Sequence, residues 1–230
     1  MHAAKHAFSF TAVPDMLPIV VLISGTGSNL RAIHGAIEAG RCRARIAAVI
    51  SDRPRAAGLE FAQAHDIPTS TVRMRAHPDR DSWNLALADE VARYTPSLVV
   101  LAGFMKIVNA DFVARFAHRI INVHPALLPL FPGTDAPAQA IDAGVRLSGC
   151  TVHLVDAGVD TGPILAQGAV RVSPNDTPET LHARIQHAEH HLLPRVIDQI
   201  ARGTLEFGAR PRWHISDDQP DIFPAPSQLA

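Results

Sequence analysis

Short apolar runs alternate with longer amphipathic segments along the first half of the chain. Four runs rich in β-branched residues predict buried strands, at 18–24, 45–51, 67–72 and 97–103. The segments between them have apolar residues at helical spacing and predict helices, at 28–40, 56–65 and 81–94. In the first of these, Ser28 is a possible N-cap and Gly40 a stop signal. Such alternation is typical of parallel strands joined by right-handed helical crossovers.

The rhythm changes after Gly103, where a proline-rich loop at 125–137 interrupts the pattern. Helices are predicted near 109–117 and 135–143 and over 178–200, and strands at 119–124 and 150–155, with one or two more in 162–172. We therefore expect an α/β fold: a single-domain, doubly wound, mostly parallel sheet with helices on both faces. Residues 1–17 are expected to be a disordered extension, 18–207 the domain, and 208–230 an irregular tail.

Composition narrows the class of protein. The 230 residues are 47% hydrophobic and only 5% aromatic, which suits helices packed on a buried sheet and excludes disordered, collagen-like and fibrous proteins. Lys and Arg total 21 against 22 Asp and Glu, so no global field favours nucleic acid or an anionic membrane. Any anionic ligand must be held by a local site.

Cysteine usage and the apolar runs bear on location. Cys42 and Cys150 are too few for a disulfide framework and have no metal-ligand spacing, which favours a reducing cytoplasm. The longest apolar run, at 17–23, is far too short to span a membrane. We expect a cytoplasmic protein without a membrane or nucleic-acid partner.

The first candidate site is a glycine-rich turn, 24–29, between the first predicted strand and helix. Small residues allow close backbone approach, and free N–H groups at a helix N-terminus form an anion site, so a phosphate could bind here. Leu30 stands where a dinucleotide fingerprint has its third glycine, and no Walker lysine follows. A plain tight turn remains an alternative. Asp52, at the end of the second strand, is a weak candidate for a ribose-binding acid.

The second candidate is Asn122 with His124. Two residues apart on a strand, they point to the same side at its carboxyl end, where ligands bind in open α/β sheets. A histidine can act as general acid or base, and an asparagine amide can donate to a developing oxyanion. Since the chain has 13 histidines, a surface or structural role for His124 stays open.

The third candidate is an acidic loop at 156–163. Asp and Gly also form ordinary turns, and the acids lack calcium-loop spacing. We favour a carboxylate partner for a histidine, because an anionic neighbour stabilises the imidazolium form of His124 for acid catalysis.

Five segments together resemble one family. They read ISGTGSNL, VLAGFMKIV, INVHPALLP, GCTVHLVDAGVDTGPILAQ and RIQHAEHHLLPRVI, in order over about residues 18–207. This pattern is similar to that of the folate-dependent phosphoribosylglycinamide formyltransferases of purine biosynthesis. The resemblance implies a formyltransferase-like variant of the Rossmann fold.

The resemblance also implies a reaction and its residues. The formyl group of 10-formyltetrahydrofolate passes to the amine of 5-phosphoribosylglycinamide, without a metal, and the catalytic residues are Asn122, His124 and Asp160. The residues expected to bind the phosphorylated substrate are Gly27, Ser28, Asn29, Gln186 and Glu189. Those expected to bind folate are Arg80, Met105, Lys106, Ile107, Val108, Asn122 and Asp156.

Two departures from the family pattern are visible. Lys106 stands where the family usually has arginine, which replaces a fork-shaped donor by a point charge and bears on folate affinity. Residues 134–137 replace two family histidines, so no catalytic role is assigned to them.

Two other functions remain as rivals. One is another enzyme that uses formyltetrahydrofolate, a hydrolase or a tRNA formyltransferase, although about 17 residues before the domain and 23 after it are expected to be too few for the extra domain of either. The other is a non-catalytic nucleotide-binding module. The expected partners are small-molecule substrates, with the chain a monomer or weak homodimer.

Overall fold

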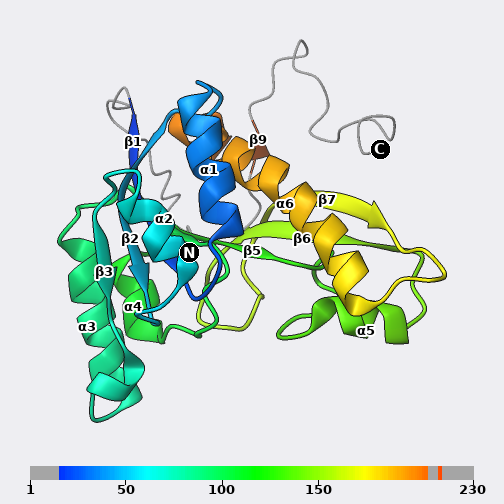
Figure 1. Ribbon diagram of the computed structural model, residues 1–230, viewed down its shortest axis with the longest axis horizontal. Helices are drawn as coiled ribbons and strands as arrows, with labels where there is room; N and C mark the ends of the chain where they lie inside the picture. The colour runs from blue at the N-terminus through cyan, green and yellow to red at the C-terminus, as the bar shows by residue number, and fades with distance from the viewer. Residues whose placement is uncertain (1–15, 207–211, 214–230) are drawn as a thin grey trace, which may run out of the picture.

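The computed structural model describes residues 16–206 and 212–213, and a seven-stranded sheet forms its centre (Figure 1). The strands are β1 Leu17–Ile23, β2 Ala44–Ser51, β3 Thr69–Thr71, β4 Leu98–Leu101, β5 Ile120–His124, β6 Leu147–Leu154 and β7 Ile164–Arg171. The helices are α1 Ser28–Glu38, α2 Ala57–Gln63, α3 Arg80–Ala92, α4 Ala110–Arg115, α5 Ala136–Asp142 and α6 Pro178–Ala201, with a 3₁₀ turn at Met74–Ala76.

Strand order determines where a ligand can bind. The order is β3-β2-β1-β4-β5-β6-β7, with parallel pairing from β3 to β5 and antiparallel pairing of β6 with β5 and β7. The chain leaves β1 towards one edge and returns at β4 towards the other, so the switch point lies between these two strands. Ligands bind at the carboxyl ends of strands around such a point. The expected doubly wound, mostly parallel sheet is confirmed.

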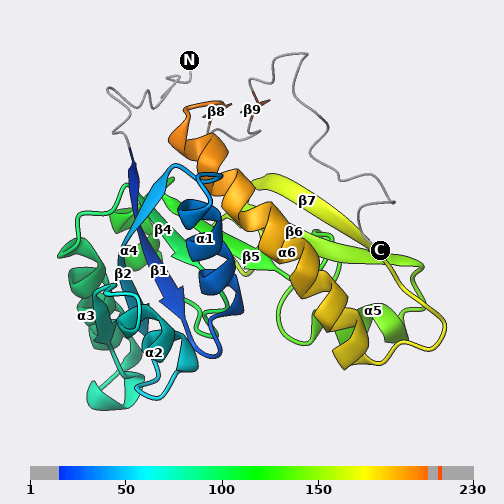
Figure 2. The ribbon, with the colours of Figure 1, turned by 45° about the horizontal axis from the view of Figure 1, so that its top comes forward.

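Helices cover both faces of the sheet. On one face α1 and α6 pack against each other and α6 crosses β6 and β7 (Figure 2), where Leu30, Ile33 and Leu193 are fully buried. On the other face α3 and α4 bury Trp83 and Phe112 in a second core. Burying these faces removes large apolar areas from water, which is the main stabilising contribution to such a fold.

The start of helix α6 is marked by a strong local sequence signal. Thr177 accepts a hydrogen bond from the Thr180 N–H, and the Thr180 side chain accepts from the Thr177 N–H, which is a capping box. Pro178 occupies the first turn, where its missing N–H has no cost. These signals fix the start of α6 where the periodicity predicts it.

Several boundaries differ from the sequence expectation. Gly27, not Ser28, is the N-cap of α1, with a left-handed φ of 73° and no capping side chain. Gly40, with φ 67°, does end that helix as expected. Residues 162–172 contribute one strand, β7, because Ile164–Arg171 pairs with β6 along its length with one irregularity.

Both termini bear on the expected domain limits. Leu17 is buried in β1, so the predicted extension is one residue too long at that end, and residues 1–15 lie outside the described part. Arg212–Trp213 (β9) pairs with Leu205–Glu206 (β8), so the tail is not irregular at those two residues. The rest of 207–230 lies outside the described residues. Among the helices of the described ranges, none combines the length and apolar character needed to cross a bilayer.

Candidate functional site

Asp160 is the centre of a cluster of polar side chains at the carboxyl end of β5. One of its oxygens, Oδ2, lies 3.3 Å from His124 Nδ1 and accepts the Gly133 N–H at 2.9 Å. The other, Oδ1, accepts from the Asn122 amide at 3.3 Å and lies 3.5 Å from His153 Nε2. The three residues expected to be catalytic are therefore brought together by a β5 terminus and a loop 36 to 38 positions further along the chain.

The surroundings of Asp160 favour its anion. Burial raises the pKa of this carboxyl, but hydrogen bonds from His153 and the Gly133 N–H, with the positive charges of His124 and His153, outweigh burial and lower it. Its backbone has φ 54°, a left-handed conformation that directs the side chain inward at some cost in strain. A carboxylate held ionised against a histidine is the arrangement that the sequence favours.

His124 is nearly inaccessible to solvent and is held at both ring nitrogens. Nδ1 faces the Asp160 carboxylate, and Nε2 donates to the Phe131 carbonyl at 2.8 Å. Both neighbours are hydrogen-bond acceptors, so the imidazolium, with two N–H groups, satisfies both contacts. The ring can therefore serve as a proton donor.

His153 is a member of this cluster that the sequence did not single out. It lies in β6 directly opposite Asn122, and its Nε2 is 3.2 Å from the Asn122 amide nitrogen. Its Nδ1 lies 2.9 Å from the Leu154 carbonyl oxygen, and the side chain is buried. The available signal was strand alternation: Val152 and Leu154 face one core, which leaves a histidine on the opposite side of an apolar strand.

A cavity of about 230 Å³ opens beside Asp160. Its walls are mostly apolar and come from the proline-rich loop and the loop before β7, with Leu128, Pro132, Val159 and Ile164 among them. An apolar cavity with a few convergent polar groups is typical of a small-molecule site.

The glycine-rich turn has the geometry of an anion site. A Cβ on Gly27 would lie 2.8 Å from the Gly58 Cα, so only glycine lets the turn approach α2 this closely. No side chain caps α1, and its first turn contains no acidic residue. The N–H groups there, with the positive end of the helix dipole, remain available to a phosphate.

Asn29 and Glu189 bring α1 and α6 together beside this turn. The Asn29 amide donates to Glu189 Oε2 at 2.8 Å although the residues are 160 positions apart. Burial raises the pKa of the Glu189 carboxyl to about 7, partly offset by the Asn29 hydrogen bond. The Asn29 Oδ1 atom is buried without a hydrogen-bond partner in the described part of the chain, which leaves an acceptor free for a ligand. Gln186, one turn earlier, is half-buried.

Asp52 has a structural partner within the same region. Its carboxylate accepts from the Ser24 hydroxyl at 2.6 Å, and the Ser24 oxygen accepts the Met105 N–H at 2.8 Å. Asp52 therefore ties the glycine-rich turn to the loop after β4. This contact gives Asp52 a positioning role, and the ribose contact considered from the sequence stays a prediction.

The residues expected to bind folate are only partly gathered. Arg80 donates to the Ile107 carbonyl at 2.7 Å, which places the N-terminus of α3 beside the loop after β4. In that loop Met105 and Ile107 are 68% and 54% exposed, Lys106 is half-buried and Val108 is buried. None of these four lines the cavity beside Asp160.

Asp156 acts within its own loop. Its Oδ1 accepts from the Gly158 N–H at 3.0 Å and from the Thr161 hydroxyl at 2.7 Å, which holds the loop that carries Asp160.

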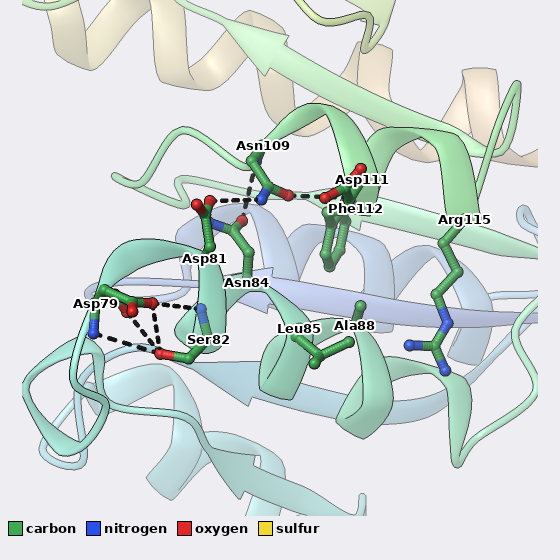
Figure 3. A pocket seen from close by; sticks show the side chains of 10 residues that line it. All are labelled: Asp79, Asp81, Ser82, Asn84, Leu85, Ala88, Asn109, Asp111, Phe112 and Arg115. Carbon is green, nitrogen blue, oxygen red and sulfur yellow. Dashed lines mark hydrogen bonds between the residues drawn. The ribbon is translucent and has the colours of Figure 1, made fainter.

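A second cavity, of about 380 Å³, lies between α3 and α4 (Figure 3). Its polar groups already bind one another. The Asn109 amide donates to the Asp81 carboxylate, the Asn109 N–H donates to the Asn84 side chain, and the Ser82 N–H donates to the Asp79 carboxylate. It contains none of the expected site residues. Across residues 16–206 and 212–213 no three or more His, Cys, Asp or Glu side chains gather in a way that could hold a metal ion.

Comparison with known proteins identifies the family. Residues 17–197 match the formyl transferase family. A phosphoribosylglycinamide formyltransferase from Mycobacterium tuberculosis (strain CDC 1551 / Oshkosh) is 49% identical over 191 residues, which cover 82% of this chain and 88% of that protein.

Solved structures agree with this match. A glycinamide ribonucleotide transformylase from Symbiobacterium toebii superposes with a TM-score of 0.85 at 43% identity, covering 91% of this chain and 99% of that one. A formyltetrahydrofolate deformylase from Pseudomonas syringae pv. tomato gives 0.81 at 27% identity, covering 88% and 67%. The chain belongs to the formyl transferase family, among the phosphoribosylglycinamide formyltransferases.

Proposed function

We propose that this protein transfers the formyl group of 10-formyltetrahydrofolate to the amine of 5-phosphoribosylglycinamide, a step of purine biosynthesis. The observation that carries the proposal is the cluster in which the Asn122 amide and the His124 ring each lie 3.3 Å from an oxygen of the Asp160 carboxylate. The family match supplies the reaction class.

The cluster supports acyl transfer by stabilising charge on oxygen. As the substrate amine attacks the formyl carbon, the formyl oxygen becomes an oxyanion, which the Asn122 amide and the His124 imidazolium can both stabilise by donating hydrogen bonds. The contact from His124 Nε2 to the Phe131 carbonyl must then be exchanged for one with the reacting group, or the donation must come from Nδ1. Burial of the ring strengthens such donation, because little water competes.

The protons balance within the same cluster. The new carbon–nitrogen bond forms as the amine nitrogen loses a proton, and the bond to the folate nitrogen breaks as that nitrogen gains one. His124 is positioned to donate and accept protons in this exchange, and the Asp160 anion stabilises its charged form. No covalent bond to the enzyme forms.

The phosphorylated substrate is assigned to the α1 turn and α6. The N–H groups of Gly27, Ser28 and Asn29 would hold the phosphate, supported by the absence of a capping side chain on α1. Gln186 and Glu189 would bind the rest of this substrate. The free Oδ1 acceptor of Asn29 supports a ligand with hydroxyl or amine donors there.

The folate is assigned to the start of α3, the loop after β4 and the loop that carries Asp160, next to the cluster. The residues proposed for it are Arg80, Met105, Lys106, Ile107, Val108, Asn122 and Asp156. Exposed Met105 and Ile107 offer apolar surface for a planar ring, and the cavity beside Asp160 supplies further apolar walls. The chemistry of these side chains therefore fits the co-substrate.

Formyl transfer assays with three acceptors test the proposal. Purified protein with 10-formyltetrahydrofolate is offered 5-phosphoribosylglycinamide, initiator Met-tRNA, or water alone, and tetrahydrofolate release is followed. We expect rapid release only with the first. Tetrahydrofolate release at an equal rate with water alone would favour a hydrolase, the activity named for the structurally similar deformylase. No release with any of the three acceptors would favour a non-catalytic binding module.

The setting of the enzyme is part of the same proposal. We propose a cytoplasmic enzyme with small-molecule substrates, present as a monomer or a weak homodimer. The two free, buried cysteines are consistent with a reducing compartment.

A further inference from the structure

Two histidines on the outer side of α6 face each other one helical turn apart. His187 and His191 are both exposed, and their Nε2 atoms are 3.3 Å apart. The rings meet edge to face with centroids 4.7 Å apart. Residues at i and i+4 share one face of a helix, so the backbone itself holds this pair together.

The separation of the two nitrogens matches that of two ligands on one metal ion. Zinc binds histidine nitrogen at about 2.0–2.1 Å in a tetrahedral arrangement, which places two ligand nitrogens about 3.3 Å apart. In the absence of metal, one ring donates its N–H to the other, which keeps the two nitrogens at this distance. A metal ion would replace this hydrogen bond, with both Nε2 atoms unprotonated and turned towards the ion.

Only the neutral imidazole coordinates a metal ion, so metal binding competes with protonation of the pair. Arg41 lies near enough to His191 for its charge to act on that ring. The Arg41 charge also repels a dication, which argues for modest affinity.

We propose that His187 and His191 form a two-histidine site for a borderline divalent transition metal such as Zn²⁺, Ni²⁺ or Cu²⁺, with water completing the coordination. Imidazole prefers these ions over Mg²⁺ and Ca²⁺, which take oxygen ligands. The site lies outside the cluster around Asp160, and the ion takes no part in formyl transfer.

The histidine pair lies on the same turns of α6 as the residues proposed to bind the phosphorylated substrate. His187 follows Gln186 directly and lies two residues from Glu189 on the same helix. An ion bridging one turn of a helix stabilises that turn, because metal binding to the folded form alone shifts the folding equilibrium. Bound metal would therefore stiffen the segment of α6 that carries the proposed substrate contacts.

Calorimetry on untagged, chelator-treated protein tests the site. Titration with ZnCl₂ or NiCl₂ is expected to show one equivalent bound in the micromolar range, and MgCl₂ none. His187→Gln combined with His191→Gln is expected to weaken binding by at least about tenfold, since both ligands of the pair are then removed. His182→Gln, at another exposed histidine of α6, is the matched control and should bind as the unmodified protein does.

Thermal unfolding gives a second readout that does not depend on activity. NiCl₂ should raise Tm for the unmodified protein and for His182→Gln, and leave the double variant unchanged. Absence of one-equivalent binding, or equal affinity and equal Tm shift in the double variant, would overturn the proposal. A double variant with its own Tm preserved in chelator excludes misfolding as the cause of lost binding.

Discussion

Asn122 and His153 lie directly opposite each other on β5 and β6, and both side chains reach the same oxygen of Asp160. The other oxygen is shared by His124 and the Gly133 N–H. Each carboxylate oxygen thus has one neighbour from β5 and one from another segment. This division explains how the loop that carries Asp160 is fixed against the sheet, because shifting it would disrupt contacts to three separate segments.

The hydrogen bond from His153 is expected to set the pH range of activity. His153→Leu removes a contact that lowers the pKa of Asp160, so that pKa rises. Activity that needs the carboxylate falls as pH drops through this pKa, and the acidic limb of the kcat profile therefore moves to higher pH. Because the pKa of Asp160 starts below its ordinary value, we expect the loss of kcat to appear at acid pH and to be small at pH 7. Rate measurements from about pH 3 to 8 locate the limb.

Substitution by glutamine is the matched comparison for this position. His153→Gln keeps a side-chain N–H donor and should leave the acidic limb closer to its original position. An acidic limb unmoved in His153→Leu would show that this histidine has only a packing role.

Removal of either member of the His124–Asp160 pair is expected to affect turnover more than binding. His124→Ala deletes the proton donor, and Asp160→Asn deletes the charge that favours the imidazolium. General acid–base catalysis contributes about 10²–10⁴-fold, and we expect kcat losses of that size in each variant. Calorimetry with 5-phosphoribosylglycinamide should show binding within a few-fold of the unmodified protein. Near-normal kcat in both variants contradicts the assignment.

Much of the fold follows from local patterns. The β1 run and the α1 periodicity, with the glycine-rich turn between them, predict the first unit within a few residues, because a buried parallel strand and an amphipathic helix each have a distinct apolar period. The N-cap of α1 was misplaced by one residue. Ser28 suits a cap chemically, but the left-handed backbone at Gly27, set by its close approach to Gly58, places the cap there instead.

The partners within the site could not be predicted in the same way. The contact of His153 with Asp160 depends on the antiparallel register of β6 against β5, which apolar alternation alone does not fix. The acceptor for His124 is a backbone carbonyl, at Phe131, and any residue type could supply it. The bond between Asn29 and Glu189 joins helices at opposite ends of the chain. Resemblance assigned these last two residues to one substrate, and their direct contact is visible only in three dimensions.

Closing the glycine-rich turn with a larger residue should weaken binding of the phosphorylated substrate. Gly27→Val places a branched side chain against the Gly58 backbone at a left-handed φ, which displaces the turn from its position. We expect KM for 5-phosphoribosylglycinamide to rise about tenfold or more, with a smaller effect on KM for the folate. Steady-state kinetics with each substrate varied in turn measure both.

Gly35→Ala is the control for this substitution. Gly35 lies within the same helix, and a Cβ there meets no atom within 4 Å. Alanine is favoured over glycine in a helix, so this variant should be as stable as the unmodified protein or slightly more so, with unchanged KM. An unchanged KM in Gly27→Val would remove the turn from the proposed phosphate site.

The buried Glu189 carboxyl should make the stability of the protein depend on pH. Its pKa is about 7 in the folded protein against an ordinary 4.5, because burial disfavours the charged form. Between these two values the folded state binds more protons than the unfolded state, so the free energy of unfolding falls as pH rises from about 4.5 to 7. Below 4.5 and above about 7 this group adds no further change.

Glu189→Gln removes the titrating group while keeping an acceptor for the Asn29 amide. For the unmodified protein, titration of Glu189 should lower the free energy of unfolding by on the order of 3 kcal/mol between pH 5 and pH 8, for a pKa shift of this size. The glutamine variant should not show this contribution. Urea unfolding of both proteins at pH 5 and pH 8, without substrate, measures the difference. Relative to the unmodified protein, the free energy of unfolding of the variant should be higher at pH 8 than it is at pH 5. At pH 8, but not at pH 5, the unmodified protein must bury the charge of Glu189. A gap that is the same at both pH values would mean that Glu189 stays ionised throughout, and that a cation or solvent reaches it in the folded protein.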